Sequence, residues 1–284
     1  MTRLRLGTRG SPLAKAQSRW VAERLERLHP GIGVETVVIK TSGDLSLPVP
    51  NVKTAFVKEL EEALLRGDID IAVHSAKDLP EKSAEGLCIL AYPEREDPRD
   101  AFVGAEACRT WAALPRGSVL GTSALRRKVQ LLRIRPDLRI EPLRGNVDTR
   151  LRKLAQGAFS GLVLAAAGLK RLGLQVPSES FPTDVLVPAP GQGALAVQAC
   201  SERAELGALL SALDDPDTRL EVELERRFAA AVGGGCSTPL GAFARCEGEG
   251  VRLTVFFSDL LTDRAGKSAE ELSSLVERLR RRIL

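Results

Sequence analysis

Strand patterns alternate with helix patterns along most of the chain, and this alternation limits the fold more than any other feature. Residues 4–8 have a strand pattern, and Ser11 and Pro12 then supply an N-cap followed by proline at the first helical position. That helix is predicted to end near residue 28. The same order recurs, with further strands expected at 34–40, 69–74, 118–121, 138–142 and 161–165, and helices at 54–66, 122–134 and 147–156. Such repeats predict an α/β fold with largely parallel sheets.

The chain has 284 residues, too many for one ordinary hydrophobic core, so we expect several domains. Segment 188–193 is predicted to cross between two α/β units, and a strand at 194–199 to return to the first sheet. We therefore expect a discontinuous first α/β domain (1–93 plus 190–213) and a second (94–189), which face each other across a cleft. A small C-terminal α+β domain (214–284) is expected to contain a helix at 216–231, strands at 240–245 and 251–258, and a helix at 269–283.

Composition excludes several classes of protein. No apolar run approaches the roughly 18 residues of a membrane span, and the N-terminus has no signal-peptide core, so we expect a cytoplasmic protein. The five cysteines are never paired as C-x-x-C, and the chain has only two histidines. Neither a disulfide framework nor a metal site is therefore indicated.

Arginines cluster between residues 126 and 152, although the net charge of the chain is only +4. The guanidinium group is a permanently charged, planar fork suited to carboxylates and phosphates. This segment is therefore interpreted as a surface that meets an anion. A solvated helix face with ion pairs is the alternative.

Cys236 follows a run of three glycines and precedes Ser237, Thr238 and Pro239. Glycines tolerate positive φ and carry no Cβ, so the backbone can approach a bulky group attached to the sulfur. The pattern favours a thiol presented for chemistry. A small buried hydrophobic side chain in a turn is the alternative, because no histidine or lysine stands immediately beside Cys236 to act as a base.

Polar or basic residues follow the carboxyl ends of the predicted strands. They occur at Thr8-Arg9, at Ser75 to Asp78, at Ser123 to Arg127 and at Arg144 to Asn146. In open α/β sheets ligands bind at this edge, next to helix N-termini whose dipoles favour anions. The irregular segment 41–52 is predicted to be a mobile, functional loop.

Seven segments together resemble one family, in family order and over most of the chain from Leu4 to Gly241. They are Arg9-Gly10-Ser11-Pro12-Leu13-Ala14, Lys40-Thr41-Ser42-Gly43-Asp44, Phe56-Val57-Lys58-Glu59-Leu60, His74-Ser75-Ala76-Lys77-Asp78-Leu79-Pro80, Gly121-Thr122-Ser123-Ala124-Leu125-Arg126-Arg127, Arg144-Gly145-Asn146-Val147, and Glu225-Arg226 through Cys236 to Pro239. The family is the porphobilinogen deaminases, or hydroxymethylbilane synthases.

This resemblance implies a transferase that joins four porphobilinogen molecules head to tail with release of ammonia. Growth would start on a dipyrromethane cofactor attached to Cys236 by a thioether, and hydrolysis would release the linear tetrapyrrole hydroxymethylbilane. An anchoring role also accounts for a presented cysteine without an adjacent base. The resemblance further implies a monomer in haem biosynthesis, whose product a tetrapyrrole-cyclising enzyme would receive, with no nucleic-acid or membrane partner.

The resemblance also assigns roles to the basic residues, since each pyrrole carries acetate and propionate groups. Those expected to hold the cofactor are Lys77, Ser123, Arg126, Arg127 and Arg144. Those expected to bind substrate are Arg9, Ser11, Arg150 and Arg171, with Lys53 and Phe56 closing over the site. Any of these arginines could instead be a structural ion-pair partner. Outside the motifs, Arg133, Arg135 and Arg139 are expected to be surface residues.

Asp78 is the acid predicted to carry the chemistry. Loss of ammonia from porphobilinogen leaves a cationic azafulvene, and a carboxylate beside the pyrrole nitrogen would stabilise that charge and move protons. N-capping of the turn at Lys77 to Pro80 is the alternative role. Ala76 and Leu79 depart from the usual family residues beside Asp78, as do Ser237 and Thr238 after Cys236, but every charged or covalent role remains filled.

Three other functions are compatible with parts of the pattern. Two α/β domains around an arginine-lined cleft also describe a periplasmic-type solute-binding protein, which the predicted third domain and Cys236 argue against. A nucleic-acid protein would use the arginines for phosphates, but aromatic residues make up only 4% of the chain. A hydrolase with Cys236 as nucleophile lacks a credible base.

Overall fold

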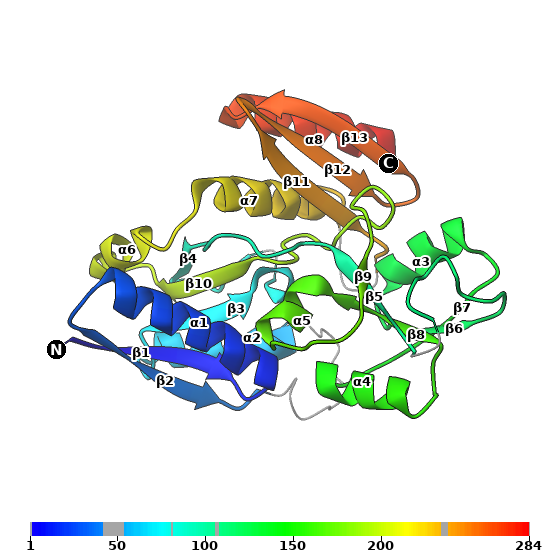
Figure 1. Ribbon diagram of the computed structural model, residues 1–284. Coiled ribbons are helices and arrows are strands. Elements are labelled where there is room, and N and C mark those ends of the chain that lie inside the picture. Colours follow the sequence, from blue (N-terminus) through cyan, green and yellow to red (C-terminus); the bar gives the residue numbers. More distant parts are fainter. Residues whose placement is uncertain (1, 42–53, 81, 106–107, 234–237, 284) are drawn as a thin grey trace. The chain divides into compact units, whose positions relative to one another are not determined.

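The computed structural model describes residues 2–41, 54–80, 82–105, 108–233 and 238–283, and it divides into two compact units (Figure 1). Unit 1 comprises Met1–Glu96 and Ala194–Glu223, and unit 2 comprises Asp97–Gly193 and Leu224–Leu284. Among the described helices, none has the length and apolar character to cross a membrane.

Unit 1 is built on a five-stranded sheet of order β2-β1-β3-β10-β4. Its strands are β1 (Thr2–Arg9), β2 (Ile32–Ile39), β3 (Ile71–Ser75), β4 (Leu87–Ala91) and β10 (Leu195–Cys200). Its helical segments are α1 (Pro12–Leu28), α2 (Thr54–Leu65), the 3₁₀ turn η2 (Ala76–Asp78), α6 (Ala204–Ser211) and the first half of α7 (Pro216–Ala231). The parallel pairing of β1 with β2 and β3 is as predicted. Strand β10 returns antiparallel between β3 and β4, which confirms the expectation for 194–199.

The two faces of this sheet carry separate apolar layers. On one face Leu6 and Val197 of the sheet pack with Val21 and Leu25 of α1 and with Leu210 of α6. On the other face α2 packs through residues spaced at i, i+3 and i+4, including Leu60, Ala63 and Leu64. The helix α2 therefore covers the face of β3 that presents Ala72 and His74.

Unit 2 contains a second five-stranded sheet and a small three-stranded sheet. The five-stranded sheet has the order β7-β6-β8-β5-β9, with strands β5 (Asp100–Gly104), β6 (Val119–Gly121), β7 (Arg139–Glu141), β8 (Gly161–Ala165) and β9 (Glu179–Ser180). Its helices are α3 (Leu125–Ile134), α4 (Val147–Ala155) and α5 (Ala166–Arg171). Strand β6 is parallel to β7 and β8, while β5 runs antiparallel to β8. The α/β class is thus confirmed in both units, but neither sheet is largely parallel, because the pairings of β10 with β3 and β4 and of β5 with β8 and β9 are antiparallel.

The C-terminal part of unit 2 is an antiparallel meander, β11 (Gly241–Glu247), β12 (Gly250–Phe256) and β13 (Leu260–Gly266), followed by α8 (Ala269–Ile283). It is the expected α+β arrangement, but with a third strand that sequence analysis did not predict. The start of α3 was also predicted wrongly. Residues 122–124 form a loop in which Thr122 Oγ1 accepts a hydrogen bond from Ala124 N at 3.3 Å, so the helix begins at Leu125.

Candidate active site

The predicted site residues of unit 1 lie at one edge of its sheet. Because β1 and β3 are parallel neighbours, their carboxyl ends meet at that edge. Arg9 is the last residue of β1, and Ser11 is the N-cap of α1, where its Oγ accepts a hydrogen bond from Ala14 N at 3.2 Å. The carboxyl end of β3 continues directly into η2, which carries Lys77 and Asp78.

The η2 turn is anchored by its apolar members and leaves its polar members half-buried. Ala76 N donates to Ala194 O at 3.0 Å, and the side chains of Ala76 and Leu79 are buried in one apolar cluster. Lys77 and Asp78 between them are of intermediate exposure. Ser75 occupies the N-cap position and Asp78 is the last residue of the turn, so the N-cap role considered for Asp78 is wrong.

The predicted residues of unit 2 follow the carboxyl ends of β6, β7 and β8. Ser123 lies in the loop after β6 and donates through Oγ to Leu143 O at 2.9 Å. Arg144 is exposed in the loop after β7. The neighbouring Gly145 has a φ of 109°, a conformation that side-chain-bearing residues rarely adopt, and this turn leads into α4.

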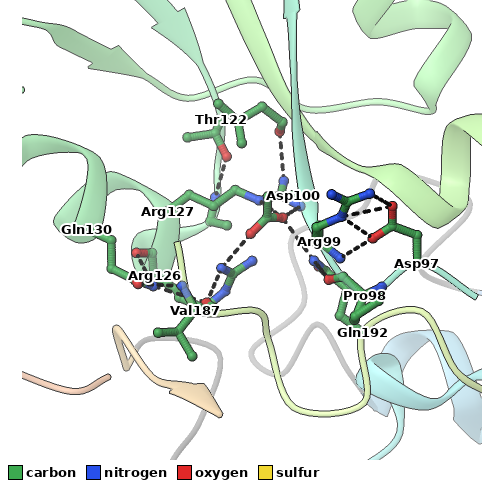
Figure 2. A network of polar contacts seen from close by, with 12 residues as sticks. Asp97, Pro98, Arg99, Asp100, Thr122, Arg126, Arg127, Gln130, Val187 and Gln192 are labelled. Carbon is green, nitrogen blue, oxygen red and sulfur yellow. Dashed lines mark hydrogen bonds and ion pairs between the residues drawn. The ribbon is translucent and has the colours of Figure 1, made fainter. Parts of the chain in front are cut away.

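Arg126 and Arg127, on the first turn of α3, converge on one buried carboxylate (Figure 2). Asp100, at the start of β5, is fully buried, and the two arginines are only 5% and 6% exposed. Arg126 Nη1 donates to Asp100 Oδ2 at 2.7 Å, and Arg127 Nε donates to Asp100 Oδ1 at 2.8 Å. Gln192 Nε2 adds a hydrogen bond to Oδ1 at 3.0 Å. Both arginines are therefore structural ion-pair partners, whatever else they bind.

Backbone carbonyls hold the same guanidiniums from the other side. Arg126 Nη1 also donates to Val187 O at 2.6 Å, and Arg127 Nη1 donates to Val163 O at 2.8 Å. The amide of Gln130 bonds both to Val187 N and to Val187 O, which fixes that carbonyl. Charge-assisted contacts of this kind fix the orientation of the arginine forks before any ligand arrives.

The electrostatics of this cluster leave positive charge in excess. Burial alone would raise the pKa of Asp100, but the guanidiniums of Arg126 and Arg127 outweigh burial and hold that pKa well below its ordinary value. Burial lowers the pKa of Arg127, and burial together with the charge of Arg127 lowers the pKa of Arg150. Arg126 and Arg127 thus share one carboxylate in the described part of the unit, and the charge of Arg127 also repels that of Arg150, an arrangement that favours a bound anion.

Two further predicted arginines are positioned by backbone carbonyls. Arg150, on α4, donates through Nε to Gly145 O at 2.7 Å. Arg171, the last residue of α5, donates through Nη2 to Gly193 O at 2.7 Å. These two hydrogen bonds fix where the guanidinium groups lie.

Part of the predicted site lies outside the described residues. Cys236, Lys53 and most of loop 41–52 belong to the segments without a description, as does the side chain of Phe56. The roles expected for them stay predictions.

One arginine was assigned wrongly, and one acid was missed. Arg135, expected at the surface, is largely buried, because it pairs with Asp137 at 2.7 Å and donates to Leu114 O at 2.9 Å. Asp100 was not singled out, although an acid opening the apolar run Ala101-Phe102-Val103 must be paired if the strand is buried. That pattern is the signal that would have found it.

Fold and site together define a two-unit α/β protein with a buried cluster of arginines around one carboxylate in unit 2. Family models give the particular assignment. Residues 4–208 match the dipyrromethane cofactor-binding domain of porphobilinogen deaminase, and residues 219–273 match its C-terminal domain. The chain belongs to the porphobilinogen deaminase family.

Two curated relatives support this membership. The chain is 49% identical over 251 residues to the porphobilinogen deaminase of Syntrophus aciditrophicus, an alignment that covers 87% of this chain and 82% of that one. It is 46% identical over 274 residues to the Geobacter sulfurreducens enzyme, covering 95% and 86%. Among solved structures, lipoprotein Tp32 from Treponema pallidum has a TM-score of 0.48 at 16% identity and covers 80% of this chain and 95% of its own. As a family member the chain is a transferase of tetrapyrrole synthesis that uses a dipyrromethane cofactor.

Proposed function

We propose that the arginines at the sheet edge of unit 2 hold the carboxylates of cofactor and growing chain, while Asp78 in unit 1 carries the chemistry of porphobilinogen polymerisation. The observation that supports the first part is the excess of buried positive charge around Asp100. A neutral ligand would leave that charge uncompensated, whereas acetate and propionate groups would compensate it.

The donor set fits a dipyrromethane. Its acetate and propionate groups need several fixed donors, and Arg126, Arg127 and Arg144 offer guanidinium forks while Lys77 offers an ammonium group. The hydroxyl of Ser123 donates to Leu143 O and would have to turn away from that carbonyl to contact the group. Cys236 would hold the group by a thioether. When bound, the dipyrromethane supplies the free pyrrole carbon to which the first substrate unit is joined.

The proposed role of Asp78 follows from its chemistry and its support. In the reaction the C–N bond of porphobilinogen breaks, ammonia leaves with the electron pair, and positive charge develops on the pyrrole. A half-buried carboxylate on a short, anchored turn would stabilise that charge without having to reorganise. The same carboxylate would accept the proton lost after each new C–C bond forms.

The remaining predictions for the site concern substrate binding. Arg150 and Arg171, each positioned by a hydrogen bond to a backbone carbonyl, would each bind a substrate carboxylate. Arg9 and Ser11, at the edge shared with η2, would hold the substrate beside Asp78. Lys53 and Phe56 are proposed to close over it on the family resemblance alone.

We also propose the three-domain division, with 214–284 as a cofactor-carrying third domain. Support comes from the separate three-stranded sheet β11-β12-β13. A monomeric state and transfer of the product to a cyclising enzyme stay predictions from the resemblance, and a cytoplasmic location stays a prediction from the composition of the sequence.

Intact-protein mass spectrometry tests the proposal. The purified chain should weigh more than its sequence by two pyrrole units, and Cys236→Ser should remove the excess. Asp78→Asn should keep the fold and the mass excess yet lose turnover by about 10²–10⁴-fold, the usual contribution of general acid–base catalysis. Asp68→Asn, an exposed residue of the same unit, is the matched control. A wild-type chain that shows no excess mass and no turnover after incubation with porphobilinogen would refute the cofactor assignment, and near-normal turnover of Asp78→Asn would refute its catalytic role.

A further inference from the structure

Three polar side chains of unit 1 form a hydrogen-bonded chain beneath the turn that carries Asp78. His74 on β3 bonds through Nε2 to Gln198 Oε1 at 2.9 Å, and Gln198 Nε2 donates to Glu61 Oε1 at 2.8 Å. His74 is 5% exposed and Gln198 is fully buried. The three residues come from β3, β10 and α2, so the chain links three separate elements.

The direction of each hydrogen bond follows from Glu61, the last of the three residues. An ionised carboxylate only accepts hydrogen bonds, so Glu61 requires the NH₂ group of Gln198 to face it. The carbonyl oxygen of Gln198 then faces His74, whose Nε2 must carry the proton. The hydrogen-bond network therefore assigns the neutral Nε2–H tautomer, with Nδ1 unprotonated.

The surroundings of His74 keep the imidazole neutral. Burial lowers its pKa, the hydrogen bond to Gln198 partly opposes that effect, and the charge of Arg9 lowers it further, giving a pKa of about 4. The charged group that acts on the imidazole is thus Arg9, from the end of β1, while Glu61 meets His74 only through Gln198. Neither a general base at Nε2 nor a permanent cation is available at this position near neutral pH.

The position of these three hydrogen-bonded residues indicates what they could do for the turn η2. His74 is separated from η2 only by Ser75, and its cross-strand partner Ala196 lies two residues after Ala194, which accepts the hydrogen bond of Ala76 N. The path of β3 into η2 is thus held by a backbone contact to β10 and by a side-chain contact to the same strand. Any loss of the side-chain contact would be transmitted directly to the backbone that carries Asp78.

We propose that Gln198 and Glu61 are positioning residues, which lock His74 as the neutral Nε2–H tautomer and thereby hold the end of β3 that presents Asp78. The functional consequence, but not the tautomer, rests on the role proposed above for Asp78. Breaking the hydrogen bonds between His74, Gln198 and Glu61 should lower kcat and kcat/KM together, since the effect is on charge stabilisation in the transition state and not on substrate binding.

Nitrogen-15 NMR of the imidazole rings tests the tautomer without any need for cofactor or substrate. The chain has two histidines, so a His29→Asn background leaves His74 as the only signal. The expected spectrum has a protonated Nε2 and a bare Nδ1, unchanged between about pH 6 and 9. In Gln198→Leu a mixture of tautomers should appear. A wild-type His74 that is protonated on Nδ1, or that titrates in this pH range, would overturn the proposal.

Kinetics with variants of Glu61, which is half-buried, test the positioning role. Glu61→Gln keeps an oxygen acceptor for Gln198 and should retain near wild-type kcat, whereas Glu61→Leu should lose about tenfold or more, within the roughly 10²-fold that a 1 Å misplacement can cost. Val73→Ala, on the opposite face of β3, controls for a general loss of stability and should keep kcat. Equal kcat for Glu61→Leu and Glu61→Gln in folded protein would refute positioning even if the mass experiment succeeds.

Discussion

Replacement of Asp100 by asparagine is the perturbation with the largest expected effect on stability. The carboxylate accepts hydrogen bonds from Arg126, Arg127 and Gln192 and has no exposed surface. Asparagine is nearly isosteric, so it creates no cavity. It has one acceptor oxygen, however, and its NH₂ group would face a guanidinium donor.

The magnitude follows from the charge left behind. Removing one partner of a buried ion pair costs about 3–5 kcal/mol, because the remaining charge is uncompensated. Asp100 serves two guanidiniums, Arg126 and Arg127, so the upper part of that range is expected. At about 2–4 °C per kcal/mol for a chain of this size, the melting temperature should fall by roughly 8–20 °C.

Thermal and urea unfolding of the purified protein measure this effect. Asp97→Asn is the matched control, because Asp97 pairs at 2.6 Å with a half-exposed Arg99 and such pairs contribute about 0–1 kcal/mol. The stability that Asp100 contributes to the wild-type protein should also be lost in acid. Since the pKa of Asp100 is lowered on folding, its stabilisation is complete above the unfolded pKa of about 3.9 and is lost as pH falls below that value. An Asp100→Asn protein within 1 kcal/mol of the Asp97→Asn control, on this estimate, would refute the reasoning.

Two further predictions concern backbone space and a buried imidazole. A Cβ at Gly161 would collide with the fully buried ring of Phe102, so Gly161→Ala should destabilise by about 1–3 kcal/mol. Gly207→Ala, inside helix α6 with nothing near the new methyl group, should stabilise by about 0.5–1 kcal/mol, and urea unfolding that ranks the two the other way would contradict the packing. His74, with its pKa lowered to about 4, should destabilise the fold as pH falls from the unfolded value of about 6.5 toward 4, by about 3 kcal/mol in total. Comparison of the pH dependence of unfolding with that of His74→Gln checks this, and identical slopes would argue against a buried neutral ring.

The sequence predicted those elements whose signals are local. Helix α1 begins at Pro12 and α7 at Pro216, as expected from proline at the first helical position. Strand β13 was missed because its side chains alternate between partial and full exposure, with few apolar residues to reveal a buried face. Strand β9, by contrast, exists through its pairing with β5, which no local pattern encodes.

The site was predictable to the same extent. Arginines in motifs could be assigned to an anion because residue type and cluster are visible in the chain itself. Their counter-ion could not be predicted, because Asp100 lies 26 residues before Arg126 in the sequence and the two meet only in the folded unit. Arg135 was called a surface residue for a related reason, because the carbonyls that bind it lie more than 20 residues away in the sequence.

The pairing of Arg126 and Arg127 with Asp100 changes what these arginines can be said to do. An arginine held only by its ligand would be free to reorient when the ligand grows, whereas these two are fixed by a carboxylate and by backbone carbonyls. Fixed forks suit a group that stays in place, such as a cofactor tethered by a thioether, because no orientation entropy is lost on binding. An anion bound at these forks, as proposed above, would also stabilise the fold by linkage. We therefore expect Asp100→Asn to lower the free energy of unfolding more in Cys236→Ser, which lacks the tether, than in the wild-type chain. Equal losses in the two backgrounds would show that these arginines do not bind the cofactor.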